Sequence, residues 1–262
     1  MDKLQEICEK KKKHVEYKKS LRSEKDLSYM LADKPLPTGF LSAMKRAKGS
    51  ALIAEVKKAS PSKGIIREDF DPVEIAKIYK KYGATCLSVL TDEPYFQGHD
   101  DFLTQIKDEV NIAVLRKDFM VDPYQIYESR ALGADCILLI IAALDDCLAR
   151  EMYEIARSLR MDILVEVHNL HELERANKLN PMMIGVNNRN LKTLKVDVST
   201  SYDLLMSMPA GCFKISESGI ASHDTLSRLA HAGYQGFLVG ESLMRQDNIG
   251  RAVQELLGNV ED

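Results

Sequence analysis

Five apolar runs in this chain end in charged or amide side chains, and this pattern restricts the fold more than any other feature. The runs cover residues 52–57, 112–117, 163–166, 183–187 and 213–217. A parallel strand that is buried on both faces is expected to be continuously apolar. In a closed barrel of eight β/α units, however, the carboxyl end of each strand contributes side chains to a shared active-site mouth. The pattern therefore predicts a barrel enzyme.

Strands and helices are predicted to alternate from residue 50 onward. The expected strands are 51–57, 85–90, 111–116, 135–141, 162–167, 182–187, 212–216 and 236–240. Amphipathic helices are expected between them, at 72–82, 123–132, 145–159, 170–179, 222–232 and 249–257. Such units predict one domain over residues 1–262, an α/β fold of the (β/α)8 TIM-barrel class. A doubly wound open sheet is the alternative, but no GxGxxG motif follows the first strand.

Length and composition agree with a single-barrel enzyme. The chain has 262 residues, and a barrel typically takes about 250. A formal net charge of -3 provides no overall attraction to nucleic acid or membrane surfaces. The five cysteines form no CxxC pair, so we interpret them as buried free thiols in a reducing, cytoplasmic environment.

Residues 1–48 differ from the rest and are predicted to form an N-terminal helical extension. Its apolar positions, interspersed with lysines, are Leu4, Ile7, Cys8, Val15 and Tyr17. This pattern indicates an amphipathic helix whose charged face is expected to be solvated. Residues 35–39 interrupt the helical pattern, and another short helix is expected from Phe40. We expect the extension to cap the barrel rather than to form an independent domain.

Glu55 and Lys57 lie on the same face of the first predicted strand, because strand side chains alternate with a period of two. If that face is the barrel interior, an acid and an amine share one wall of the mouth. The alternative is a structural ion pair that only neutralises two buried charges. Lys117, Glu166 and Glu217 weaken this alternative, since so many interior charges would cost stability relative to apolar packing.

Small and hydroxylated residues occupy the loops after the first, seventh and eighth predicted strands. The first loop contains Ser60, and the last two contain Ser218-Gly219 and Gly240-Glu241. In barrels the loops after strands seven and eight often bind phosphate through backbone N–H groups. Glycine lets an anion approach the backbone without obstruction from a Cβ atom. These loops therefore predict a phosphorylated substrate.

Seven segments carry longer motifs. They are IAEVKKASPSKG (53–64), VLTDEPYFQG (89–98), LRKDFMVDPYQI (115–126), LVEV (164–167), IGVNNRNL (184–191), ISESGI (215–220) and FLVG (237–240). In this order and spacing they resemble the indole-3-glycerol-phosphate synthase family over residues 50–245. The first and third segments are long enough to be highly specific.

The resemblance implies a cofactor-free lyase of tryptophan biosynthesis. Its substrate would be 1-(2-carboxyphenylamino)-1-deoxyribulose 5-phosphate, and its products indole-3-glycerol phosphate, carbon dioxide and water. By this resemblance Lys117 is the general acid, and Glu166 is the general base or second acid in the dehydration. Lys57 would hold the substrate carboxylate and assist the acid steps. The polar side chains that would support the lysines and the ligand are Glu55, Asn187, Arg189 and Glu217.

The remaining candidates carry weaker signals. Phe96 and Phe119 suit the walls of an aryl pocket, although core packing explains them equally well. Glu241 would repel a phosphate if it faced inward, so only backbone contact is expected there. We interpret the four histidines that fall in loops or at helix starts as surface or capping residues, and no spacing suggests a metal site. These histidines are His99, His168, His171 and His223.

Two other functions compete with this interpretation. Phosphoribosylanthranilate isomerase, the preceding step of the pathway, would need a cysteine–aspartate pair where this chain has Glu55 and Lys57. A barrel that binds phosphate without catalysis could sense a metabolite or scaffold a complex. The sequence leaves open the oligomeric state and contact with other tryptophan-pathway enzymes.

Overall fold

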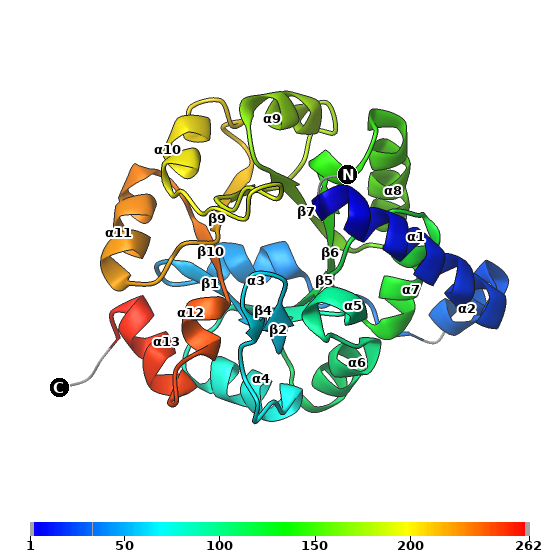
Figure 1. The fold of residues 1–262 in the computed structure, drawn as a ribbon, viewed down its shortest axis with the longest axis horizontal. Helices are drawn as coiled ribbons and strands as arrows, with labels where there is room; N and C mark the ends of the chain where they lie inside the picture. The colour runs from blue at the N-terminus through cyan, green and yellow to red at the C-terminus, as the bar shows by residue number, and fades with distance from the viewer. Residues whose placement is uncertain (1–2, 33, 260–262) are drawn as a thin grey trace.

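Eight parallel strands close into a barrel in the computed structural model, which describes residues 3–32 and 34–259 (Figure 1). The barrel strands are β1 (Ala51–Val56), β4 (Cys86–Leu90), β5 (Val114–Lys117), β6 (Cys136–Ile140), β7 (Asp162–Val167), β8 (Met183–Asn187), β9 (Phe213–Glu217) and β10 (Gly236–Val239). β1 pairs with both β4 and β10, so the sheet has no free edge. The closed barrel confirms the predicted fold class and excludes the doubly wound alternative.

Helices surround the barrel (Figure 1). The helices between and after the strands are α4 (Pro72–Lys81), α6 (Asp100–Glu109), α7 (Tyr124–Leu132), α8 (Asp146–Ser158), α9 (Leu170–Asn177), α10 (Ser199–Leu205), α11 (His223–Ala232) and α13 (Ile249–Leu257). Loop elements are β2 (Ala59–Ser60), β3 (Gly64–Ile65), α5 (Glu93–Phe96), the 3-10 turn η1 (Ile141–Ala143) and α12 (Glu241–Met244). The prediction gave no range for α6 or α10, since α6 fully buries only Leu103 and Ile106 and α10 spans seven residues.

Strand side chains alternate between two apolar cores. The core outside the sheet packs against the helices and includes Leu52, Val114 and Val165. The core inside the barrel includes Ile53, Leu115, Leu164 and Ile215. Because the period is two, a residue two positions beyond an interior side chain also points inward. The interior positions at the carboxyl ends of the strands are Glu55, Lys117, Glu166, Asn187 and Glu217.

One strand begins later than its apolar content suggests. Val110, Ile112 and Ala113 are buried, yet β5 starts only at Val114 and continues to Lys117. The amide of Ile112 donates to the carbonyl of Val110 at 2.8 Å, which closes a tight turn before the strand. The predicted strand at 111–116 is therefore displaced toward the carboxyl end.

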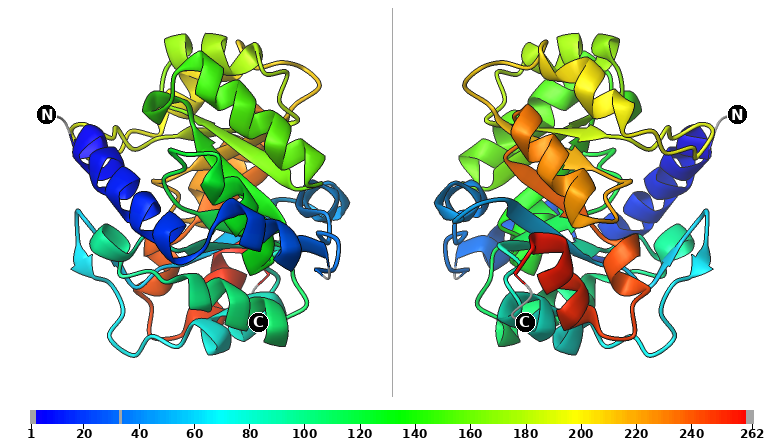
Figure 2. Two further views of the ribbon diagram at one scale, coloured as in Figure 1. Left: turned by 90° about the vertical axis from the view of Figure 1, so that its right-hand side faces the viewer. Right: turned by 90° about the vertical axis from the view of Figure 1, so that its left-hand side faces the viewer.

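The N-terminal helices contact both ends of the barrel. α1 (Lys3–Leu21) lies beside the mouth, α2 (Glu24–Ala32) packs on α7, and α3 (Phe40–Arg46) lies at the opposite end (Figure 2). At that opposite end the Leu41 amide donates to Asp162 at 2.8 Å, and the Thr38 amide donates to Asp135 at 2.6 Å. No helix among the described residues is long and apolar enough to cross a membrane.

Three sequence expectations about exposure are wrong. Tyr17, assigned to the apolar side of α1, is 62% exposed. Lys11, expected on a solvated face, is 4% exposed. Its position follows the spacing of Leu4, Ile7 and Cys8, so it belongs to the buried stripe of the helix. Of the five cysteines, all of which are free thiols, Cys147 is exposed and the others are buried.

Candidate active site

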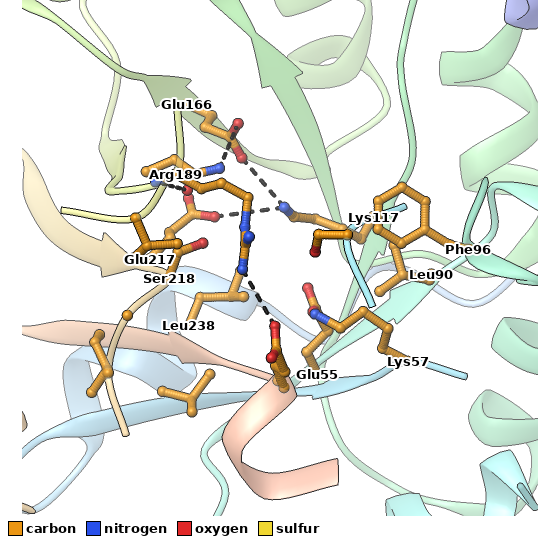
Figure 3. Close-up of a pocket in the computed structure, with 18 of the residues that line it drawn as sticks. Glu55, Lys57, Leu90, Phe96, Lys117, Glu166, Arg189, Glu217, Ser218 and Leu238 are labelled. Carbon is orange, nitrogen blue, oxygen red and sulfur yellow. Dashed lines mark hydrogen bonds and ion pairs between the residues drawn. The ribbon is translucent and has the colours of Figure 1, made fainter. Parts of the chain in front are cut away.

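A cavity of about 630 Å³ opens at the carboxyl ends of the strands (Figure 3). It brings together nearly all the site residues predicted from the sequence: Glu55, Lys57, Phe96, Lys117, Phe119, Glu166, Asn187, Arg189, Glu217, Ser218, Gly219, Gly240 and Glu241. Ser60, the remaining one, lines an adjoining pocket of about 80 Å³ beneath α1. The residues that sequence analysis selected are thus neighbours in space.

Lys117 lies at the centre of the charged side chains (Figure 3). Its Nζ is 3.3 Å from Glu166 Oε2 and 3.6 Å from Glu217 Oε2. Burial by itself would lower the pKa of Lys117, but the carboxylates of Glu166, Glu217 and Glu55 raise it above its ordinary value. The carboxylates outweigh burial, and Lys117 is a cation at neutral pH.

Glu166 is ionised in this arrangement. Burial opposes its charge, but Lys117 and His168 lower its pKa below the ordinary range. The side-chain amide of Asn187 donates to Glu166 Oε1 at 3.2 Å, which also favours the charged form. A protonated amine and an ionised carboxylate in one cavity supply a general acid and a general base at the same pH.

Glu217 behaves differently. Burial and the neighbouring Glu166 carboxylate raise the pKa of Glu217 to about 8, although Lys117 opposes this shift. Neither of its carboxyl oxygens has a hydrogen-bond partner within the described part of the chain. The raised pKa favours the protonated form of this side chain, which can donate a hydrogen bond.

Glu55 and Lys57 form a direct ion pair, with Nζ 2.5 Å from Oε1. Burial opposes the charge of Glu55, but Lys57 and Lys117 lower its pKa. The sequence left two alternatives for this pair, a purely neutralising ion pair or two groups that line the mouth. In the structure the two residues neutralise each other and also line the cavity. We call Glu55, Lys57, Lys117, Glu166 and Glu217 the mouth cluster.

Two glycines make room for the mouth-cluster carboxylates. A Cβ atom at Gly185 would overlap the Glu217 carboxylate, and one at Gly240 would overlap that of Glu55. The Cβ atom added at Gly240 would also lie 2.9 Å from the Cβ of Glu55. The sequence predicts only a phosphate-binding role for Gly240. The structure shows in addition that residue 240 has no room for a side chain beside Glu55.

The loops after β9 and β10 line one side of the cavity. Ser218 and Gly219 have φ angles of 66° and 77°, a left-handed turn that glycine adopts without strain. Glu241 lines the cavity and is paired with two arginines. Its carboxylate lies 3.4 Å from Arg189 and 3.5 Å from Arg245, so two cations neutralise it.

Aromatic and aliphatic side chains form another wall. The rings of Phe96 and Phe119 are 6.2 Å apart between centroids and tilted by 39°. Leu191 and Leu194 line the same cavity, and Ile7 of α1 lines the adjoining pocket. An apolar wall beside a charged floor suits a planar ring that carries ionic substituents.

A second set of buried charges escaped the sequence analysis. Lys11 Nζ lies 2.7 Å from both Asp92 Oδ1 and Asp118 Oδ1. Arg116 contacts Asp100 and Glu128, each at 2.8 Å. Arg116 points outward because it neighbours the inward Lys117 on β5. We call these residues, with Lys18, the flank network: Lys11, Lys18, Asp92, Asp100, Arg116, Asp118 and Glu128.

The prediction that His168 is a surface or capping residue is wrong. Its side chain is 9% exposed, and its Nε2 atom lies 3.2 Å from Glu166 Oε1. The signal that could have found it is its spacing, since residue 168 shares the inward face of residue 166. Among the described residues, no three His, Cys, Asp or Glu side chains are placed to hold a metal ion.

Fold and site together define a (β/α)8-barrel enzyme with an acid–base pair at its mouth. Residues 4–256 match the sequence profile described as indole-3-glycerol phosphate synthase. The chain belongs to the indole-3-glycerol phosphate synthase family. This result confirms the recognised family and the predicted enzyme class, a lyase of tryptophan biosynthesis.

The similarity to curated relatives extends over the whole chain. Indole-3-glycerol phosphate synthase of Azospirillum brasilense is 52% identical over 259 residues, which cover 98% of this chain and 99% of the relative. The enzyme of the same name from Zymomonas mobilis subsp. pomaceae is 49% identical, over 97% of this chain and 98% of the relative.

More distant solved structures share the fold. A variant tryptophan synthase alpha-subunit from Pyrococcus furiosus superposes with a TM-score of 0.62 at 15% identity, covering 81% of this chain and 99% of its own. A 3-hexulose-6-phosphate synthase reaches 0.58 at 12% identity, over 80% of this chain and 100% of its own. These likenesses support the barrel architecture.

Proposed function

We propose that this protein converts 1-(2-carboxyphenylamino)-1-deoxyribulose 5-phosphate into indole-3-glycerol phosphate, carbon dioxide and water at the mouth cluster. The observation that carries this proposal is the contact of a Lys117 cation with an ionised Glu166, 3.3 Å apart inside the cavity. The reaction needs both an acid and a base, and these two groups are in the required states at neutral pH.

Lys117 acts in the ring closure. The aryl carbon that bears the carboxylate bonds to the ketone carbon, and the ketone oxygen takes a proton from Lys117. The carboxylate then leaves as carbon dioxide, and its bonding electrons restore the aromatic ring. The preference of Lys117 for the protonated form supports its role as the donor.

Glu166 and Lys57 act in the dehydration. Glu166 removes a proton from the methylene carbon of the new ring, while Lys57 protonates the hydroxyl that leaves as water. The proton on Glu166 returns to Lys117 across their contact, and Lys57 regains its proton from solvent. Over one turnover the reaction consumes one proton, which balances the loss of the carboxylate.

The ends of the substrate bind on opposite sides of the cavity. The carboxylate binds Lys57, and the aryl ring lies against Phe96 and Phe119. The phosphate binds the loops after β9 and β10, at Ser218-Gly219 and Gly240-Glu241. A dephosphorylated substrate analogue should therefore bind the parent enzyme poorly, and equal affinity for both analogues would remove this phosphate site.

We include residues 1–48 in the same functional domain. Ile7 of α1 lines the pocket that adjoins the cavity, so the extension covers one end of the bound substrate. We place the enzyme in the cytoplasm, a reducing compartment that suits its free thiols.

The decisive test is Lys117→Ala in a steady-state assay of indole-3-glycerol phosphate formation. The kcat should fall by about 10²–10⁴-fold, the usual worth of a general acid, while the Kd of a substrate analogue stays within a few-fold. Lys80→Ala is the matched control, because Lys80 is exposed on α4. Turnover within a few-fold of the parent would remove Lys117 from the acid role.

A further inference from the structure

His168 contacts the active-site carboxylate from a side that the proposed mechanism does not use. It follows β7 by one residue, and its Nε2 atom lies 3.2 Å from Glu166 Oε1. Lys117 approaches the other oxygen, Oε2, at 3.3 Å. The carboxylate is therefore held between two groups that can each carry a positive charge.

The other ring nitrogen of His168 is anchored to α9. Nδ1 lies 2.9 Å from Glu172 Oε2, in the first turn of the helix. The Glu172 carboxylate also accepts from the His168 amide at 2.8 Å and from the Asn169 side chain at 2.6 Å. Asn169 in turn caps the helix by accepting from the Glu172 amide. Glu172 is thus fixed by the helix start, and it fixes the imidazole.

The groups facing His168 are Glu166 from β7 and Glu172 from α9, so two carboxylates flank one ring. Burial opposes a charge on the imidazole, but close contacts and charge interactions with both carboxylates raise the pKa of His168 to about 9. At neutral pH the ring therefore carries a proton on each nitrogen. Nδ1 donates to Glu172, while Nε2 faces Glu166 Oε1 at 3.2 Å as an ion pair without hydrogen-bond alignment.

We propose that His168 is a positioning residue that, protonated between Glu166 and Glu172, fixes Glu166 Oε1 and leaves Oε2 directed at Lys117 and the substrate. The imidazole of His168 thereby connects Glu172, at the start of α9, to Glu166, the proposed base. This inference rests on the role proposed for Glu166. A purely structural His168 would tie α9 to β7 and would leave the titration of Glu166 unchanged.

The test compares His168→Asn and Glu172→Gln with His171→Asn, a control on the same helix whose side chain is exposed. His168→Asn should lower kcat by about 10–100-fold, a range typical of groups that orient a ligand, with KM within about twofold. Loss of the imidazolium raises the pKa of Glu166, so the acid limb of the pH–kcat profile should move up by about one pH unit. His171→Asn should match the parent.

Glu172→Gln should act on the opposite limb. It removes one of the two carboxylates that hold the proton on His168, so the pKa of His168 falls. The alkaline limb then moves to lower pH, while the acid limb stays in place. If both variants keep the limbs of the parent profile, the inference is wrong even where kcat or melting temperature falls.

A measurement without substrate separates this inference from the proposed function. In enzyme labelled with 15N-histidine, the His168 resonances, assigned by their loss in His168→Asn, should titrate near pH 9. Titration near the unperturbed value of about 6.5 would overturn the inference. Retained turnover in Glu166→Gln would instead refute the role of Glu166, whatever the imidazole does.

Discussion

The mouth cluster and the flank network are both largely buried sets of charges near the carboxyl ends of barrel strands, and β5 contributes to each. Lys117 faces the cavity, whereas its neighbour Arg116 faces α6 and α7. In the flank network each of four carboxylates lies 2.7–2.8 Å from Lys11 or Arg116, and Arg116 is also 3.7 Å from Asp118. In the mouth cluster Lys117 is 3.3 and 3.6 Å from its two partners.

The flank network differs from the Lys117 side of the mouth cluster in how closely its charges are paired, although Lys57 and Glu55 of the mouth cluster are only 2.5 Å apart. Burial opposes the charge of Asp118, but Lys11 and Arg116 lower its pKa and keep it ionised. Glu217, with no hydrogen-bond partner in the described part of the chain, has its pKa raised to about 8. The closely paired Asp118 stays ionised, whereas the loosely paired Glu217 has a pKa in the range where it can exchange protons with a ligand.

Glu166→Gln should have the largest effect within the mouth cluster. We expect kcat to fall by about 10²–10⁴-fold because the base is lost, with a melting temperature close to that of the parent. Steady-state kinetics and thermal unfolding on the same preparation measure both quantities. A marked loss of stability with unchanged kcat would show that Glu166 stabilises the fold, as the flank network does, and is not the base.

Lys11→Met should show the reverse behaviour. Asp92 and Asp118 would be left as buried charges without their common partner, which costs about 3–5 kcal/mol of unfolding free energy. Denaturant unfolding measures this loss, and kcat per folded molecule should stay within a few-fold. The neighbouring Lys12→Met is the control, since Lys12 is exposed and should change stability by about 0.5 kcal/mol or less. Equal effects of the two variants would contradict the flank network.

Gly240→Ala should produce a smaller loss that is confined to the mouth cluster. The added Cβ displaces Glu55, which moves Lys57 through their ion pair. We expect kcat/KM to fall by about tenfold, on the scale of a small misplacement of a reacting group. Gly211→Ala is the matched control, because a Cβ there meets no atom within 4 Å. A normal kcat/KM in Gly240→Ala would mean that Glu55 moves without consequence.

The smallest expected effect is the pH dependence of stability that arises from Glu217. Its pKa is about 8 in the folded protein, against an ordinary value of 4.5. Between these values the folded state binds the extra proton, so the contribution of Glu217 is complete below pH 4.5 and is lost as pH rises through 8. The melting temperature of the parent, relative to Glu217→Gln, should fall between pH 5 and 9. A constant difference over this range would show that Glu217 is ionised throughout.

Period-two alternation and local motifs made much of the fold and cavity predictable. Glu55 and Glu166 belong to strands whose apolar residues fix which face is inward, so the sequence alone orients them. Lys11 and His168 were misread because each looks like an ordinary surface residue of its segment. Spacing places Lys11 on the buried stripe of α1 and His168 on the inward face that residue 166 occupies, but the partners of Lys11, such as Asp118, are distant in sequence. No local pattern encodes the long-range pairing of Lys11 with Asp118.

The attachment of the extension at the base of the barrel has a consequence for biosynthesis. Thr38 and Leu41 leave the ribosome before their acceptors, Asp135 and Asp162, which follow 97 and 121 residues later. At the usual pace of translation this delay is on the order of 10 s. Throughout that interval the apolar side chains of α3, including Phe40 and Met44, have no barrel interior to enter. The nascent chain therefore exposes this apolar segment until its fifth barrel strand, β7, emerges, and chaperones have time to bind it.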